Sequence, residues 1–229
     1  MSLDDVADEL RRGSRVLLMV RHAERTKIDN EDPTFGEALP LTVEGVRTSR
    51  LFGERLREFA ADVQFMASPL LRTRQTAATI AEGMGVKGAD VPTDPLLGNS
   101  SFYFEDQREV FELFRGGSFF GEIFKYMAEG VNRGFRDIYE ASDALERWVD
   151  EVFTAKLGVF ATHDLYNAAF LYARGAKRDW TRENWVRFLD AAAIVFRPDG
   201  SRHYALVRSG LSFGTTGVVE QKIQPAAQA

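Results

Sequence analysis

Short apolar runs that alternate with helix-patterned segments constrain the fold of this chain more than any other feature. The runs Val16–Val20 and Ala191–Phe196 are wholly apolar and far shorter than the roughly 20 residues needed to cross a bilayer. We interpret both as buried strands, and residues 158–162 as a third. Because strands alternate with helices along the chain, the sequence predicts a three-layer α/β/α sandwich with a mostly parallel central sheet.

Capping residues mark the ends of the expected helices. Thr42 is expected to cap a helix whose apolar residues recur at helical spacing up to Phe59. Ser68 and Pro69 fit the N-cap and first turn of the next helix. The other expected elements are helices over 4–12, about 141–156 and 165–173, and strands over 63–67, 192–197 and 204–209.

Residues 98–140 differ in composition from the rest of the chain, because they hold eight of the eighteen phenylalanines. We interpret this segment as an inserted helical, aromatic-rich cap. In one interpretation the aromatic side chains form the core of the cap. In the other, some of them line the mouth of a site and exclude water. The residues considered for the mouth are Phe102, Tyr103, Phe119 and Phe120.

The length and composition of the chain are those of one globular domain. It has 229 residues, 45% of them hydrophobic and 28% charged, which is enough to bury a core. We therefore expect a single domain over residues 1–229. The tail over residues 214–229 has no packed pattern and is expected to be flexible.

Charge and cysteine content exclude several classes of partner and chemistry. The 29 basic and 34 acidic residues give a net charge of −5, so no global positive field attracts nucleic acid or an anionic membrane. The absence of cysteine removes disulfides, thiolate catalysis and thiolate metal sites. Residues 1–6 show no basic stretch followed by an apolar one, so we expect no secretory signal and a cytoplasmic location.

Two of the three histidines directly follow expected strands. Arg21-His22 ends the first strand and His163-Asp164 follows the strand over residues 158–162. In α/β sheets ligands gather beyond the carboxyl ends of the strands, although a single histidine at such a place is more often structural. The third histidine, His203, is expected to be structural.

Arginines close to these strand ends favour a binding site over a purely structural role for the histidines. Arg21, Arg25 and Arg72 each present a planar fork of donors, and three such forks near one point would hold a dianionic phosphate or another oxyanion. Arg74 is expected to be a solvated helix residue. The partner that this cluster predicts is therefore a small phosphorylated substrate.

Four separated motifs contain these residues. In chain order they are Arg21-His22-Ala23-Glu24-Arg25, Leu41-Thr42-x-x-Gly45, Ser68-Pro69-Leu70-Leu71-Arg72-Thr73-Arg74-Gln75-Thr76-Ala77 and Thr162-His163-Asp164. Together they resemble the histidine phosphatase superfamily, which includes phosphoglycerate mutases and acid phosphatases. The resemblance spans roughly residues 15–85 and 157–170 and rests on four motifs in order, whereas a single Arg-His dipeptide would carry little information.

The resemblance implies a phosphomonoesterase that acts through a phosphohistidine. His22 would be the nucleophile, and Arg21, Arg25, Arg72 and His163 would form the pocket that neutralises the transferring phosphoryl oxygens. No metal and no cofactor is required by this scheme. A weaker likeness to lipopolysaccharide core heptose phosphate phosphatases suggests a sugar phosphate as the substrate.

The general acid is the point on which branches of this superfamily differ. The mutase branch usually has a glutamate in a Leu-x-Glu setting, and the comparable place here, residues 94–99, contains none. In the acid phosphatase branch the acid is the aspartate of a His-Asp pair, which corresponds to Asp164. Glu105 and Asp106 in the cap are the reserve acids. The alternative role of Asp164 is to cap the helix over residues 165–173.

Three other functions stay open at this stage. The first is a phosphoglycerate mutase-type phosphotransferase, which the missing glutamate disfavours. The second is a catalytically inactive module that binds phosphorylated ligands, although such a module has no need for both His22 and His163. The third is a metal-dependent phosphatase with His22, His163 and Asp164 as ligands. The sequence gives no expectation for the oligomeric state.

Overall fold

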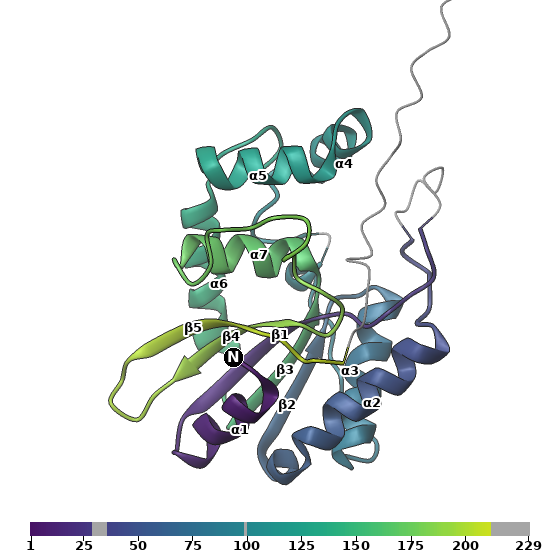
Figure 1. The fold of residues 1–229 in the computed structure, drawn as a ribbon, viewed down its shortest axis with the longest axis vertical. Helices are drawn as coiled ribbons and strands as arrows, with labels where there is room; N and C mark the ends of the chain where they lie inside the picture. Colours follow the sequence, from purple (N-terminus) through teal and green to yellow (C-terminus); the bar gives the residue numbers. More distant parts are fainter. Residues whose placement is uncertain (29–35, 99, 212–229) are drawn as a thin grey trace, which may run out of the picture.

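The described part of the chain forms a five-stranded sheet with the order β2-β3-β1-β4-β5 (Figure 1). The computed structural model describes residues 1–28, 36–98 and 100–211. The predicted flexible tail, 214–229, lies outside these residues. The strands are β1 (Arg15–Arg21), β2 (Val63–Ala67), β3 (Leu157–Thr162), β4 (Ala191–Phe196) and β5 (Arg202–Val207).

Strand direction in the sheet is mixed. β1 and β2 each pair with β3 in parallel, whereas β4 is antiparallel to both β1 and β5. Within this sheet β4 therefore runs against the other four strands, and the expectation of a mostly parallel sheet is correct except at β4. The apolar run of β4 is equally buried in either direction, so its sequence does not reveal which way it runs.

The helices begin and end largely where the capping residues place them. Thr42 accepts a hydrogen bond from the Gly45 N–H at 2.9 Å, and Gly85, which has a φ of 85°, is the C-cap residue of α3. The described helices are α1 (Leu3–Arg11), α2 (Val43–Arg55), α3 (Leu71–Met84), α4 (Gln107–Gly116), α5 (Phe119–Glu129), α6 (Ile138–Val152) and α7 (Asp164–Ala173), with 3₁₀ turns η1 (Arg57–Asp62) and η2 (Pro95–Leu97).

Two predicted helix starts are wrong. Ser68 does not cap α3, whose N-cap position is Leu70 without a side-chain cap, and Pro69 lies before the first turn. The Ser68 hydroxyl instead bonds Thr73 and His163. The helix expected over about 141–156 runs from Ile138, because Asp137 accepts hydrogen bonds from two backbone N–H groups.

The pleat of β1 divides the core into two layers. Val16, Leu18 and Val20 point to one face and pack with residues of α1, α2 and α3. Leu17 and Met19 point to the other face and pack with residues of α6, α7 and the cap. Figure 1 shows α2 and α3 on one side of the sheet and α6 and α7 on the other. The predicted three-layer α/β/α sandwich is therefore confirmed.

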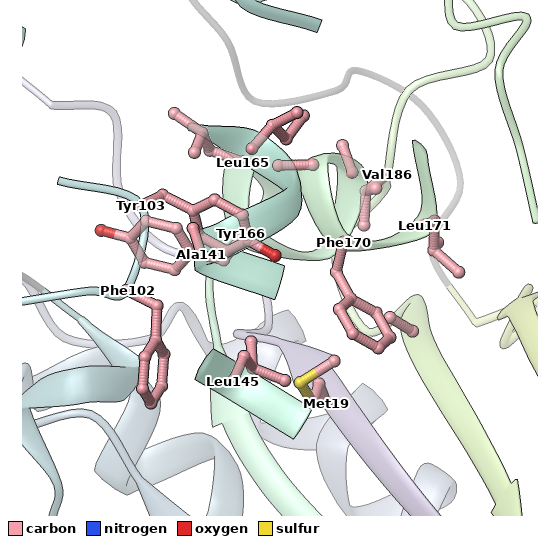
Figure 2. Close-up of a cluster of buried hydrophobic side chains, with 14 of the residues drawn as sticks. Met19, Phe102, Tyr103, Ala141, Leu145, Leu165, Tyr166, Phe170, Leu171 and Val186 are labelled. Atoms are coloured by element: carbon pink, nitrogen blue, oxygen red, sulfur yellow. The ribbon is translucent and has the colours of Figure 1, made fainter. Parts of the chain in front are cut away.

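The aromatic residues of 98–140 belong mainly to the core. Phe102, Tyr103 and Phe120 are buried in the same cluster as Met19, which supports the core interpretation for these three. Figure 2 shows Tyr103 beside Tyr166 of α7, with their rings stacked at an interplanar angle of 6°. This contact packs the segment before α4 against α7. Phe119 is partly buried and packs against the cluster.

From the sequence, no segment is expected to be long enough to cross a bilayer, and the lengths of the helices bear on this expectation. None of the helices within residues 1–28, 36–98 and 100–211 combines the length and the apolar character that crossing a bilayer requires.

Close contact between α2 and α3 requires glycine. A Cβ added at Gly53 would lie 2.0 Å from the Ile80 carbonyl oxygen and 2.8 Å from the Met84 nitrogen. Both neighbours are helix backbone, which cannot move away without separating the two helices. Gly53 is therefore fixed by packing, although alanine is the better helix former by about 1 kcal/mol.

We expect Gly53→Ala to lower the free energy of unfolding by about 3 kcal/mol, because overpacking against backbone outweighs the gain in helix propensity. Urea unfolding measures the change. Gly116→Ala is the matched control, since a Cβ at this helical glycine of α4 meets open space. Equal effects of the two substitutions would contradict the packing argument.

Candidate active site

The carboxyl ends of β1, β3 and β2 lie side by side. Arg21 of β1 is in register with Thr162 of β3. The next residue, His22, donates its backbone N–H to the Thr162 carbonyl at 3.0 Å, and Ser68 donates to the Ala161 carbonyl at 3.0 Å. The residues that directly follow three neighbouring strands therefore meet at one edge of the sheet.

The imidazoles of His22 and His163 face each other at this edge. Their ring centroids are 5.5 Å apart at an interplanar angle of 68°. Nδ1 of His22 lies 2.8 Å from the Ala23 carbonyl oxygen, and a carbonyl can only accept. Nδ1 therefore carries the proton, and in the neutral ring the lone pair resides on Nε2.

The pKa values of both histidines lie well below the ordinary value. Burial is the largest cause in each case, and the charge of Arg72 is the next. Each imidazole is thereby held neutral, because a proton would add charge to a buried and already positive neighbourhood. A neutral His22 has the lone pair that a nucleophile needs.

A pair of hydroxyls holds His163. Its Nε2 lies 3.2 Å from the Ser68 Oγ, which in turn is 2.7 Å from the Thr73 Oγ1. The Thr73 hydroxyl is itself 2.7 Å from the Leu70 carbonyl oxygen. Because Ser68 was predicted to cap a helix, its contact with His163 was not predicted.

The three arginines form a cationic cluster beside the histidines, in which Arg21 and Arg72 are buried and Arg25 is half-buried. Arg21 donates to the Val186 carbonyl at 2.5 Å, Arg72 to the Gly36 carbonyl at 2.7 Å, and Arg25 to the Thr26 carbonyl at 2.9 Å. The Nε atoms of all three are buried without a hydrogen-bond partner in the described part of the chain. Such unpaired donors are rare in folded proteins, so this cluster has donor capacity for an anion.

Repulsion between arginines also lowers the pKa values of Arg25 and Arg72. Burial is the main cause for Arg25 and Arg72, whose pKa values fall to about 10, followed by repulsion from Arg21 on Arg25 and from Arg25 on Arg72. All three groups still carry a proton near neutral pH. Bringing an anion among them would relieve the repulsion.

The segment that carries Arg25 is fixed against the start of α2. The Glu24 carbonyl accepts the Thr42 N–H at 3.0 Å, and a Cβ at Gly45 would lie 2.1 Å from that same carbonyl oxygen. Arg25 also forms an antiparallel bridge with Leu41. The glycine of the motif Leu41-Thr42-x-x-Gly45 is therefore required by close backbone approach.

Asp164 is the carboxylate that the structure brings to the arginines. Its Oδ2 lies 3.2 Å from the Arg21 Nη2 and accepts the Trp185 indole N–H at 3.1 Å. Its Oδ1 accepts the Leu165 N–H at 3.0 Å. The N-cap position of α7 is His163, with Asp164 as the first helical residue.

The reserve acids lie elsewhere. Glu105 and Asp106 are exposed, and Asp106 caps α4 by accepting the Arg108 N–H at 2.8 Å. Arg74 and His203 are also exposed, as expected. In the described residues there is no group of three or more histidine, cysteine, aspartate or glutamate side chains placed to share a metal ion.

The loop between α7 and β4 contributes residues that sequence reasoning missed. Phe188 places its ring under the Arg21 guanidinium, 4.4 Å from the centroid, and against His22 at 5.6 Å. Val186 accepts from Arg21 and Trp185 donates to Asp164. The only signal in the sequence was the placement of two of the three tryptophans, Trp180 and Trp185, in this loop.

Comparison with known proteins agrees with this geometry. Residues 17–110 match the family model of the histidine phosphatase superfamily, branch 1. Over this segment the chain is similar to that superfamily. The matched segment contains the motifs of His22, Arg25 and Arg72 as well as residues 94–99, and it ends before His163 and Asp164.

Solved structures of similar fold support the histidine phosphatase architecture. Phosphoglycerate mutase from Bacillus anthracis is 14% identical, covers 86% of this chain and 93% of its own, and has a TM-score of 0.53. A mycobacterial glucosyl-3-phosphoglycerate phosphatase is 13% identical, with 84% and 97% covered and a TM-score of 0.54. Mycobacterial hydrolase 1 is 13% identical, with 86% and 98% covered and a TM-score of 0.52. No curated protein matches the sequence significantly.

We expect His22 and His163 to titrate below the unperturbed value of about 6.5, since burial and Arg72 lower both pKa values. Between the folded and unfolded pKa values the unfolded chain binds more protons, so the free energy of unfolding falls as the pH drops below about 6.5. Proton NMR titration of the imidazole signals, assigned with single histidine variants, measures the midpoints. A midpoint at or above the unperturbed value for either residue would contradict the described environment.

Proposed function

We propose that the protein is a metal-independent phosphomonoester hydrolase that acts through a phosphohistidine intermediate on a small phosphorylated metabolite. The observation that carries the proposal is the cluster of three arginines whose buried Nε donors are unpaired within the described residues, next to two neutral imidazoles. A phosphate dianion matches both the charge and the donor geometry of such a cluster.

The nucleophile in this proposal is Nε2 of His22. Its lone pair attacks phosphorus, a P–N bond forms and the P–O bond to the leaving group breaks. Nδ1 keeps its proton on the Ala23 carbonyl, which orients the ring and stabilises the positive charge that the phosphorylated imidazole acquires. Water then attacks phosphorus, the P–N bond breaks, and phosphate and neutral His22 are regenerated.

The pocket in this proposal consists of Arg21, Arg25, Arg72 and His163. Phosphoryl transfer depends mainly on positioning and on stabilising the equatorial oxygens. Preorganised, buried guanidinium groups serve this purpose, because they need no reorganisation as the charge shifts. His163, held at Nε2 by Ser68, adds a further group beside the transferring phosphoryl.

The general acid in this proposal is Asp164. In its protonated form it gives a proton to the leaving oxygen, and as the carboxylate it accepts a proton from the attacking water. Its contact with Arg21 supports this role over Glu105 and Asp106. The substrate is a small phosphorylated metabolite, and a sugar phosphate is our first choice.

Hydrolysis of an aryl phosphate by wild type is expected to resist EDTA and to fall by on the order of 10⁴-fold or more in His22→Ala, because the nucleophile is lost. His203→Ala is the matched control, since His203 is exposed on β5, and should retain activity. Activity that EDTA abolishes would contradict metal independence. Turnover by His22→Ala at the wild-type rate would contradict the nucleophile.

Asp164→Asn is expected to slow alkyl phosphates by roughly 10²- to 10⁴-fold in kcat/KM, because their leaving oxygen needs a proton. The loss for p-nitrophenyl phosphate should stay within about 10-fold, since that leaving group departs as a stable anion. Steady-state kinetics on both substrate classes measures the difference. An equal loss on both would assign the acid to another residue.

A further inference from the structure

Trp185 connects the cap to Asp164. Its side chain is fully buried, and its indole Nε1–H donates to the Asp164 Oδ2 at 3.1 Å. On the other side its ring contacts three phenylalanines of α5, with centroid distances between 5.4 and 6.3 Å. These are Phe119, Phe120 and Phe124.

The backbone of Trp185 is fixed as well. Its carbonyl accepts the Arg208 Nη1 at 2.8 Å, and the same Arg208 atom lies 2.5 Å from the Asp190 Oδ2. Asp190 is also joined to β1, because its carbonyl accepts the Arg21 N–H at 2.8 Å. The indole therefore has little freedom to follow Asp164 if that carboxyl moves.

The donors around Asp164 are distributed unequally over its two oxygens. Oδ2 receives both Trp185 and Arg21, whereas Oδ1 receives one backbone N–H. In a protonated carboxyl the carbonyl-type oxygen accepts more readily than the hydroxyl oxygen. Two donors at Oδ2 therefore favour placement of the acid proton on Oδ1.

We propose that Trp185 is a positioning residue for Asp164, which fixes the carboxyl and directs its proton to Oδ1, with the aromatic cluster of α5 holding the indole in place. This inference rests on the proposed function, because it assigns a partner to the proposed general acid. It gives the cap helix α5 a role in the reaction through packing.

Trp180 provides the matched control. It lies in the same loop, its ring is 5.4 Å from that of Trp185, and its exposed fraction is 8%. Its Nε1 is buried and finds no acceptor among the described residues. Trp180→Phe and Trp185→Phe both remove an indole from this loop, and only the second removes a hydrogen bond to Asp164.

Trp185→Phe is expected to lower kcat/KM for alkyl phosphates by roughly 10-fold, which is the weight of one hydrogen bond. The loss for p-nitrophenyl phosphate should be several-fold smaller, because that reaction depends less on the acid. Trp180→Phe should affect both substrates equally. An equal loss on alkyl phosphates and p-nitrophenyl phosphate in Trp185→Phe, like that in Trp180→Phe, would overturn the positioning role. In that case, hydrolysis by the wild type would still support the proposed hydrolase.

A second measurement tests the hydrogen bond without turnover. The chain has three tryptophans, so three indole N–H signals are expected in a ¹H–¹⁵N spectrum, assigned with Trp→Phe variants. Asp164→Ala should move the Trp185 signal upfield and leave those of Trp180 and Trp148 in place. An unmoved Trp185 signal would overturn the inference, whether or not the protein hydrolyses phosphate esters.

Discussion

The parallel pairing of β1 with β3 is the constraint on which the candidate site depends. It brings Arg21 level with Thr162, so the residues that follow, His22 and His163, leave the sheet together with their rings 5.5 Å apart. A slip by one residue would send one imidazole to the opposite face of the sheet. The cap, the loop before β4 and the start of α3 all add groups around a position that this pairing has already defined.

Burying several positive charges together is unfavourable on its own, and the structure offsets part of this free energy with neutral acceptors. The Val186 and Gly36 carbonyls, together with the ring of Phe188, contact Arg21 or Arg72. Asp164 supplies a negative charge to Arg21. The pKa values of Arg25 and Arg72 stay lowered, mainly because the groups are buried and further because neighbouring arginines repel them. A site of this kind is poised for an anion, because the ligand supplies the missing charge.

Local residues were enough to predict the layer architecture, β1 and the Thr42 cap. An apolar run predicts β1, and a hydroxyl at the right spacing before a helix predicts the cap. The direction of β4 was not predictable, since its apolar run is the same for either direction. Ser68 was misassigned because its hydroxyl serves a residue 95 positions away, His163. Trp185 was missed because its hydrogen bond to Asp164 depends on the conformation of the loop between α7 and β4. The catalytic roles assigned to His22 and Asp164 remain predictions.

The central claim is that the phosphoryl group passes through His22, and rapid-quench mass spectrometry tests it most directly. Wild-type protein is mixed with an aryl phosphate, quenched within the first turnover under alkaline conditions, digested and searched for phosphorylated peptides. We predict one phosphoryl group, attached to His22, that appears before free phosphate accumulates and decays once the substrate is consumed. Steady release of phosphate with no phosphorylated peptide, or with the phosphoryl group on another residue, would contradict the account.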